Sequence, residues 1–242
     1  MTMTPEDLME IALESTRMTR EEWDALASDM RSDARMNQIM KRDWNAQPRD
    51  SEEAIREYYR TSKAWFVNTF NHGYGALLAM AAKAGATLQP WGNPFLKHLP
   101  YGTPEERRVL DYGGGFFKDS WPLAEVLCHV TVAEIRGPVT RFLKSFIHIA
   151  GLEHKYSVLE VDSATPLTSL YQGIICFETL EHLLHPEALT EHLFHHLTSG
   201  GPFAFSVTFP MPFSAKTRAV FKTVCICSSV SAKSPCIPRA AS

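Results

Sequence analysis

The stretch that decides the fold is Arg108–Gly115, Arg-Val-Leu-Asp-Tyr-Gly-Gly-Gly, followed by Val130–Ile135, Val-Thr-Val-Ala-Glu-Ile. The first segment has the pattern of a buried strand that runs into a glycine turn. The second has the pattern of a strand whose end carries Glu134, 21 residues after Gly113. Glycines allow a sharp turn and the close approach of a ligand. An acid at the next strand end can accept hydrogen bonds from both ribose hydroxyls, so the two segments predict a nucleoside pocket.

The spacing of the glycines bears on which nucleoside this pocket takes. A nicotinamide dinucleotide site expects Gly-x-Gly-x-x-Gly, and Gly113 and Gly115 fit the first two positions. The third position is occupied by Lys118. Because the third glycine serves close helix–strand packing near a pyrophosphate, its absence disfavours NAD and leaves an oxidoreductase as a minor alternative.

Segment 108–115 resembles motif I of the class I S-adenosylmethionine-dependent methyltransferases, in which a strand ends in Leu-Asp-x-Gly-x-Gly. Three later segments, Val158–Ser163, Gly173–Leu183 and Leu197–Phe205, resemble further motifs of this family in the expected order. The resemblance extends over roughly residues 104–210. It implies a Rossmann-like fold and S-adenosyl-L-methionine as cofactor. The Glu-x-Leu-Glu-His turn at 178–182 resembles the small-molecule branch, which implies methyl transfer to an oxygen, nitrogen or carbon atom of a small molecule.

The resemblance assigns roles to ten residues. We expect Glu134 to bind the ribose, Asp162 to meet the adenine amino group, and His182 to act as the candidate general base. The full cofactor-binding set is Asp111, Gly113, Gly114, Gly115, Glu134, Asp162, Ser163, Phe177 and Glu178. No metal ion is expected, although the spacing of Glu178, Glu181, His182 and His185 on one helical face leaves a metal-dependent RNA methyltransferase as an alternative.

The chain departs from the family pattern at Phe116-Phe117, where motif I normally continues with a small residue and a glycine. This departure and the short C-terminus motivate a second hypothesis, in which the chain is a catalytically impaired, methyltransferase-like partner subunit. Aromatic residues of the helical region, among them Tyr59 and Trp65, fit either a hydrophobic core or a lid over an aromatic acceptor.

Composition sets further bounds. The chain has 242 residues, 45% of them apolar, and a net charge of −3 without a basic stripe. This disfavours nucleic acid as a partner and is compatible with a small-molecule substrate. Five cysteines without framework spacing, and an N-terminus without signal-peptide features, favour a cytoplasmic location. No apolar run reaches the roughly 18 residues that a membrane span needs. The oligomeric state stays open.

Periodicity gives the predicted organisation. Residues 1–100 form an all-helical cap or lid, 101–226 an S-adenosylmethionine-binding domain, and 227–242 a disordered tail. Helix starts are expected at Thr4, Thr19 and Ser51, and Gly73 and Gly75 predict a kink, a break or a close approach. The expected strands are 108–112, 130–134, 156–161, 173–178 and 203–209. Their alternation with helical segments predicts an α/β fold with a mostly parallel sheet flanked by helices. Residues 214–224 are expected to form a helix and 225–227 a short strand at an incomplete sheet edge.

Overall fold

The computed structural model describes residues 3–48, 50–103, 105–126, 128–161, 167–208 and 222–228. Its helices are α1 (Pro5–Thr16), α2 (Arg20–Asp29), α3 (Asp33–Ala46), α4 (Glu52–Thr61), α5 (Lys63–Ala81), α6 (Gly92–His98), α7 (Trp121–Glu125), α8 (Pro138–Ala150) and α9 (Pro186–His195), with a short 3-10 helix η1 (Leu180–His182). Its strands are β1 (Arg108–Tyr112), β2 (His129–Ile135), β3 (Tyr156–Val161), β4 (Gly173–Cys176), β5 (Pro202–Thr208) and β6 (Lys222–Ser228).

The strands form one sheet in the order β3-β2-β1-β4-β5-β6. The first five are parallel to one another, and β6 pairs antiparallel with β5. This confirms the predicted α/β fold with a mostly parallel sheet. The register places Tyr112 beside Ala133, and the Gly113 N–H donates to the Ala133 carbonyl over 2.8 Å. The glycine turn and Glu134 therefore lie side by side at the carboxyl ends of neighbouring strands, where open α/β sheets bind ligands.

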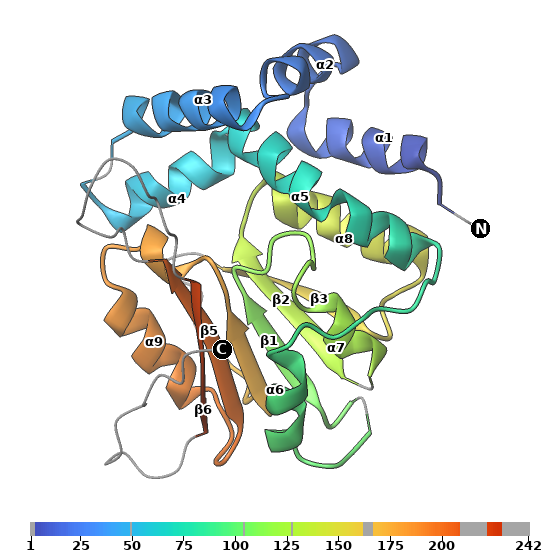
Figure 1. Cartoon of the computed structure of the whole chain (residues 1–242), viewed down its shortest axis with the longest axis vertical. Helices are drawn as coiled ribbons and strands as arrows, with labels where there is room; N and C mark the ends of the chain where they lie inside the picture. The colour runs from blue at the N-terminus through green and yellow to red at the C-terminus, as the bar shows by residue number, and fades with distance from the viewer. Residues whose placement is uncertain are drawn as a thin grey trace.

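Helices cover both faces of the sheet, as Figure 1 shows for α8 and α9. Alternation along β1 sends Val109 into one hydrophobic cluster, with Phe142 of α8, and Leu110 into another, with Leu193 of α9. Because both faces are buried, the strands are apolar at consecutive positions rather than at alternate ones, which is typical of parallel sheets.

The N-terminal helices begin where the sequence predicts. The side chains of Thr4, Thr19 and Ser51 each accept a hydrogen bond from the backbone N–H three residues later, at 3.1 to 3.2 Å. Helix α5 runs without a break through both of its inner glycines. At Gly73 a β-carbon would lie 2.4 Å from Cβ of Phe116, whereas at Gly75 it would meet nothing within 4 Å. The predicted close approach is thus confirmed at Gly73 alone.

The helical cap shares its hydrophobic core with the sheet. Leu8 and Phe66 of the cap belong to the same buried cluster as Phe142 and Val130. In Figure 1, α1 to α5 gather at one end of the sheet, while α6 lies beside the strands. Helix α6 falls within the predicted cap, yet its Phe95 lies against the sheet. A β-carbon on Gly173 of β4 would lie only 2.6 Å from the Phe95 ring. The division at residue 100 stays a prediction.

The C-terminal region differs in part from the expected pattern. Strand β6 begins at Lys222, so 222–224 belong to a strand rather than to the expected helix, and the short strand expected at 225–227 extends to seven residues. The remainder of that helix and residues 229–242 of the predicted tail lie outside the described residues. Within the part of the chain that the structure describes, no helix combines the length and the apolar character needed to cross a membrane.

Candidate functional site

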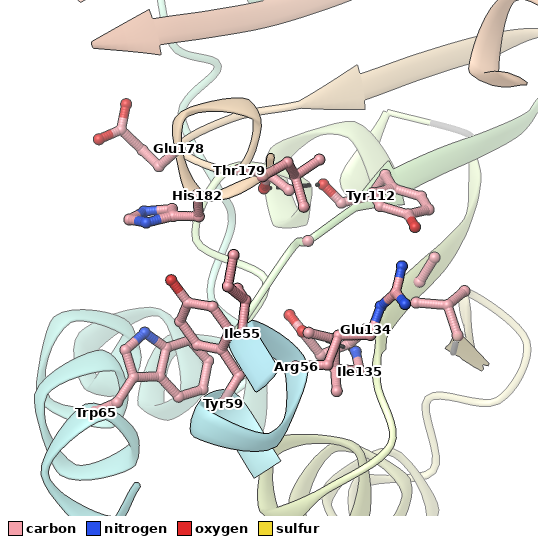
Figure 2. A pocket seen from close by; sticks show the side chains of 14 residues that line it. Ile55, Arg56, Tyr59, Trp65, Tyr112, Glu134, Ile135, Glu178, Thr179 and His182 are labelled. Atoms are coloured by element: carbon pink, nitrogen blue, oxygen red, sulfur yellow. Dashed lines mark hydrogen bonds between the residues drawn. The ribbon is translucent and has the colours of Figure 1, made fainter. Parts of the chain in front are cut away.

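A cavity opens at the carboxyl ends of β1, β2 and β4. The residues that line it are Ile55, Arg56, Tyr59, Trp65, Tyr112, Gly113, Ala133, Glu134, Ile135, Val161, Glu178, Thr179, His182 and Leu183. Strand ends and the segment around η1 form one part of the wall, and α4 with the first turn of α5 forms the opposite part (Figure 2).

Glu134, at the end of β2, is the most buried acid that lines the cavity, with 7% of its surface exposed. One carboxylate oxygen accepts the Gly115 N–H over 3.2 Å, and the other accepts the N–H of Ile135 over 2.9 Å. Burial raises the pKa of Glu134, and the two backbone N–H groups act in the opposite direction. Each carboxylate oxygen has two lone-pair sites, so each keeps one for a hydroxyl group in the cavity. The site therefore fits the ribose of an adenosyl group.

Contacts within the protein, rather than with a ligand, already require glycines in this turn. Gly113 has a φ of +72°, and a β-carbon there would lie 2.1 Å from Oγ1 of Thr179. Thr179 in turn donates to the Phe177 carbonyl over 3.0 Å. Gly115 also has a positive φ, of +50°, and donates to Glu134 as described. The turn thus brings β1, β2 and the segment after β4 into contact around one end of the cavity.

Asp111 lies beneath this turn and does not line the cavity. It is 2% exposed, and a β-carbon on Gly114 would lie 2.3 Å from its Oδ2. That oxygen has no hydrogen-bond partner among the described residues. Burial raises the pKa of Asp111 to about 8, and the charges of Asp119 and Glu134 add to the shift. This placement supports a role in the loop rather than in direct cofactor contact.

The departure from the family pattern, Phe116-Phe117, faces away from the cavity. Phe116 packs edge-to-face against Phe66, Phe70 and Phe142, at centroid distances of 5.1 to 5.6 Å. Phe117 is fully buried, and its ring lies 4.8 Å from that of Tyr156. Neither ring is among the residues lining the cavity. The two rings therefore fill the interface between the loop, α5 and α8 and leave the cavity open.

The opposite wall is aromatic. Tyr59 of α4 meets Trp65 of α5 edge-to-face, with centroids 5.0 Å apart, and meets the ring of His182 at 5.8 Å. Figure 2 shows Tyr59 projecting from α4 toward His182 across the cavity. Ser62 caps α5 and accepts the Trp65 N–H over 3.0 Å, which fixes the start of that helix. Burial raises the pKa of Tyr59, so its hydroxyl stays protonated at neutral pH.

His182 is held at the end of η1 between two acids. Desolvation of the ring by the surrounding protein lowers the pKa of His182, and the charges of Glu181 and Glu178 act in the opposite direction. The Glu178 carboxylate accepts from the Ser206 hydroxyl over 3.0 Å, and in Figure 2 it points away from Glu134. Glu178 itself has a φ of +51°, an uncommon conformation for a residue with a side chain.

Helix α4 is tied to the segment after η1. One carboxylate oxygen of Glu52, in the first turn of α4, accepts the backbone N–H groups of Leu184 and His185 over 3.0 and 3.3 Å. Its other oxygen lies 3.9 Å from Nη2 of Arg56. These contacts hold the helix that carries Ile55, Arg56 and Tyr59 across the cavity.

The structure brings some of the predicted site residues to the cavity and places others elsewhere. Gly113, Glu134, Glu178 and His182 line it. Gly115 contacts Glu134, whereas Gly114 covers Asp111. Their roles, like those of the other predicted site residues, stay predictions.

Phe177 does not lie at the position predicted for it. It is buried against Trp91, with centroids 4.8 Å apart, and is not among the described lining residues, so its placement does not support the predicted contact with adenine. Asp162 and Ser163 lie outside the described residues.

Sequence reasoning missed Arg56, Thr179 and Tyr112 as lining residues. For Arg56 a signal existed, because it lies three residues before Tyr59 on the helix that follows the Ser51 cap. No group of three or more histidine, cysteine, aspartate or glutamate side chains that could hold a metal ion is found among the described residues.

Comparison with solved structures finds distant matches. They include the StiE O-MT residues 961–1257 (23% identity, TM-score 0.38, 41% of this chain and 37% of that one) and the CcbJ methyltransferase from Streptomyces caelestis (20%, 0.42, 48% and 50%). A third is the glycopeptide N-methyltransferase MtfA complexed with S-adenosyl-L-methionine (18%, 0.42, 57% and 58%). The chain spans between 37% and 58% of the length of these three proteins. No curated protein matches the chain.

The comparison with family models covers more of the chain. The model described as "Methyltransferase domain" matches residues 82–222, which is more than half of the 242 residues. The match runs from the residue after α5 to the start of β6 and includes the glycine turn, Glu134 and the segment around η1. The predicted methyltransferase resemblance is confirmed, and S-adenosylmethionine is the cofactor that the family implies. The chain belongs to the methyltransferase-domain family.

Proposed function

We propose that this protein transfers a methyl group from S-adenosyl-L-methionine to a small-molecule acceptor bound in the cavity between α4 and the strand ends. The observation that carries the proposal is the geometry at Glu134. Its two carboxylate oxygens are oriented by the N–H groups of Gly115 and Ile135, beside a glycine turn that faces the same cavity.

The residues of this chain supply position and environment. Glu134 binds the ribose through the lone pairs that its backbone partners leave unused. Gly113 leaves the backbone at the end of β1 accessible, since it lines the cavity without a side chain. When bound, the cofactor supplies an electrophilic methyl group, so catalysis consists mainly of holding two partners in line and excluding water. Tyr59, Trp65 and Ile55 cover the cavity and serve that exclusion.

The alternative of a catalytically impaired partner subunit rested in part on Phe116-Phe117. Both rings pack into the core, and neither lines the cavity. Phe116-Phe117 therefore gives this alternative no support, and active methyl transfer is the function that the geometry favours.

Isothermal titration with S-adenosylhomocysteine tests the proposal. The wild-type chain is expected to bind one equivalent, and Glu134→Gln to bind about 100-fold more weakly. In that variant an amide N–H₂ must face either the Gly115 or the Ile135 N–H, and two hydrogen bonds to a charged acceptor are lost. Glu160→Gln is the matched control. Glu160 pairs with Glu134 in the β2–β3 register, but its side chain contacts Arg136 and Lys144 and does not line the cavity.

The control variant is expected to keep wild-type affinity. A folded wild-type chain that does not bind S-adenosylhomocysteine at millimolar concentration would overturn the proposal. Equal affinity of Glu134→Gln and wild type would remove Glu134 from the site.

A further inference from the structure

The cavity has an end that the cofactor's ribose would not occupy. Glu134, Ile135 and Val161 line the end of the cavity where the ribose would bind, at the ends of β2 and β3. Tyr59 and His182 line the cavity on the far side, together with Trp65 and Leu183. With the ribose at Glu134, this second group of residues is the wall that remains for an acceptor. We call it the aromatic end.

The rings of the aromatic end pack against one another and against neighbouring rings. Tyr59 is held by edge-to-face contacts with Tyr58, at 5.1 Å, and with Trp65, at 5.0 Å. Trp44 packs on Tyr58 in the same manner at 4.8 Å. Aromatic groups prefer edge-to-face or offset-stacked contacts, and the edge-to-face packing of these rings leaves faces and edges available to a further ring. A planar aromatic molecule therefore matches the shape and chemistry of this end.

The charges around His182 bear on the acceptor's own charge. Glu178 and Glu181 flank the imidazole on its own segment, Tyr59 faces it from α4, and Glu134 and Arg56 lie farther along the cavity wall. Two carboxylates beside the ring oppose an anionic acceptor and stabilise an imidazolium once it has formed. Arg56 has Glu52 as an acidic neighbour, which reduces its pull on an anion.

The protonation state of His182 bears on the reacting atom. Its pKa is lowered, so the neutral ring prevails at neutral pH and can accept a proton. A phenolic hydroxyl has a pKa of about 10, close enough to that of an imidazole for efficient proton transfer, whereas aliphatic hydroxyls are far less acidic. A protonated aliphatic amine has no lone pair for the methyl group, and a neutral aromatic amine needs no base before it attacks.

From these observations we infer that the acceptor is an uncharged aromatic molecule with a phenolic hydroxyl, bound against Tyr59 and Trp65 with that hydroxyl at His182. This inference rests on the proposed function. In the reaction, the phenolic oxygen forms a bond to the methyl carbon as the bond from that carbon to the sulfonium sulfur breaks. The phenolic proton passes to His182, and the electron pair of the broken bond stays on sulfur as the neutral thioether.

The experiment uses the full chain and 2-naphthol as the probe. Binding of 2-naphthol to the chain saturated with S-adenosylhomocysteine is measured by calorimetry, and methylation with S-adenosylmethionine is measured by mass spectrometry of 2-methoxynaphthalene. The comparison compounds are 2-naphthoate, 2-naphthylamine and cyclohexanol. We expect kcat/KM for 2-naphthol to exceed that for each comparison compound at least tenfold.

Preference for the acid, the amine or the aliphatic alcohol would overturn the inference. So would the absence of both binding and turnover of 2-naphthol by a chain that binds S-adenosylhomocysteine. A chain that does not bind S-adenosylhomocysteine fails the proposed function itself, and the two failures are thereby distinguished.

Two variants test the roles of individual residues. His182→Gln keeps a polar side chain of similar size but cannot take the proton, so kcat should fall 10²–10⁴-fold with KM changed less than threefold. His195→Gln, on exposed α9, is the matched control and should leave both parameters unchanged. Tyr59→Leu should raise KM for 2-naphthol at least tenfold while leaving the affinity for S-adenosylhomocysteine unaltered.

The pH profile separates proton transfer from a structural role of His182. Wild-type kcat should fall as pH drops through the lowered pKa of His182, and the profile of His182→Gln should be flat over that range. A sloping profile in the variant, or unchanged kcat, contradicts the assignment.

Discussion

The loop after β1 separates two buried carboxyl groups whose surroundings differ. Glu134, beside the loop, has a backbone N–H for each oxygen and opens onto the cavity. Asp111, beneath the loop, has one oxygen without a partner in the described part of the chain and lies away from the cavity. Phe116 continues this buried side toward α5. From this contrast we expect the cavity side of the loop to determine ligand affinity and the buried side to determine stability.

Asp111→Asn should produce the largest change in stability. With a pKa of about 8 in the fold and about 3.9 when unfolded, Asp111 keeps its proton in the folded state where the unfolded chain has lost it. Wild-type stability should therefore fall as pH rises from about 4 to 8, by as much as about 5 kcal/mol from this group. Asparagine keeps the shape and cannot ionise, so chemical denaturation at pH 8 should show a more stable variant.

The same variant probes the contrast between the two carboxyl groups. Its affinity for S-adenosylhomocysteine should stay within twofold of wild type, since Asp111 does not line the cavity. A marked loss of affinity would assign Asp111 to the cofactor site and show that the two sides of the loop do not have separate roles.

Phe116→Ala should cost about 3–5 kcal/mol of unfolding free energy, because it removes a buried ring that contacts Phe66, Phe70 and Phe142. Phe116→Leu, which retains more of the volume, should cost less and serves where the alanine variant does not fold. Urea denaturation measures both variants. Loss of S-adenosylhomocysteine binding by a folded Phe116→Leu chain would show that the buried side also shapes the cavity.

Gly73→Ala should destabilise the chain by about 1–3 kcal/mol through overpacking, since the new methyl group would meet Cβ of Phe116 at 2.4 Å. Gly75→Ala is the matched control on the same helix. Its β-carbon meets nothing within 4 Å, and alanine favours the helix by roughly 0.5–1 kcal/mol. Thermal denaturation of the pair should move in opposite directions, and equal shifts would contradict the close approach of α5 to the loop.

Proton release on binding should give the smallest signal. Burial raises the pKa of Glu134, and ribose hydroxyls that donate to the carboxylate lower it again. At mildly acidic pH, binding of S-adenosylhomocysteine should therefore release a fraction of a proton. Calorimetry in two buffers of different ionisation enthalpy measures this fraction. Proton uptake would mean that the ligand raises the pKa of Glu134, which would place a hydrogen-bond acceptor or an apolar group, rather than a hydroxyl donor, opposite the carboxylate.

Local sequence patterns were enough to predict much of this fold. The caps at Thr4, Thr19 and Ser51 and the five parallel strands follow from residue types a few positions apart. Strand β4 ends two residues earlier than predicted, because Phe177 turns to pack on Trp91, 86 positions away in the sequence. Apolarity alone does not distinguish a strand residue from one that is buried just after a strand.

The site was predictable where it depends on strand ends and much less so where the cap contributes. Glu134 and the glycine turn belong to one local pattern, and the parallel register brings them together. The aromatic wall depends on how α4 packs across the strand ends, which Glu52 fixes through the backbone of Leu184 and His185. A contact between residues more than 130 positions apart has no local signature, so Arg56 was missed even though its helical spacing was visible.

The contact between Gly73 and Phe116 limits how sequences of this kind can diverge. With the two backbones at their present separation, a β-carbon fits at position 73 or at position 116, but not at both. A relative with a larger residue at position 73 would have to bear glycine at position 116. The two positions should therefore change together over evolutionary time, exchanging a glycine between cap and loop.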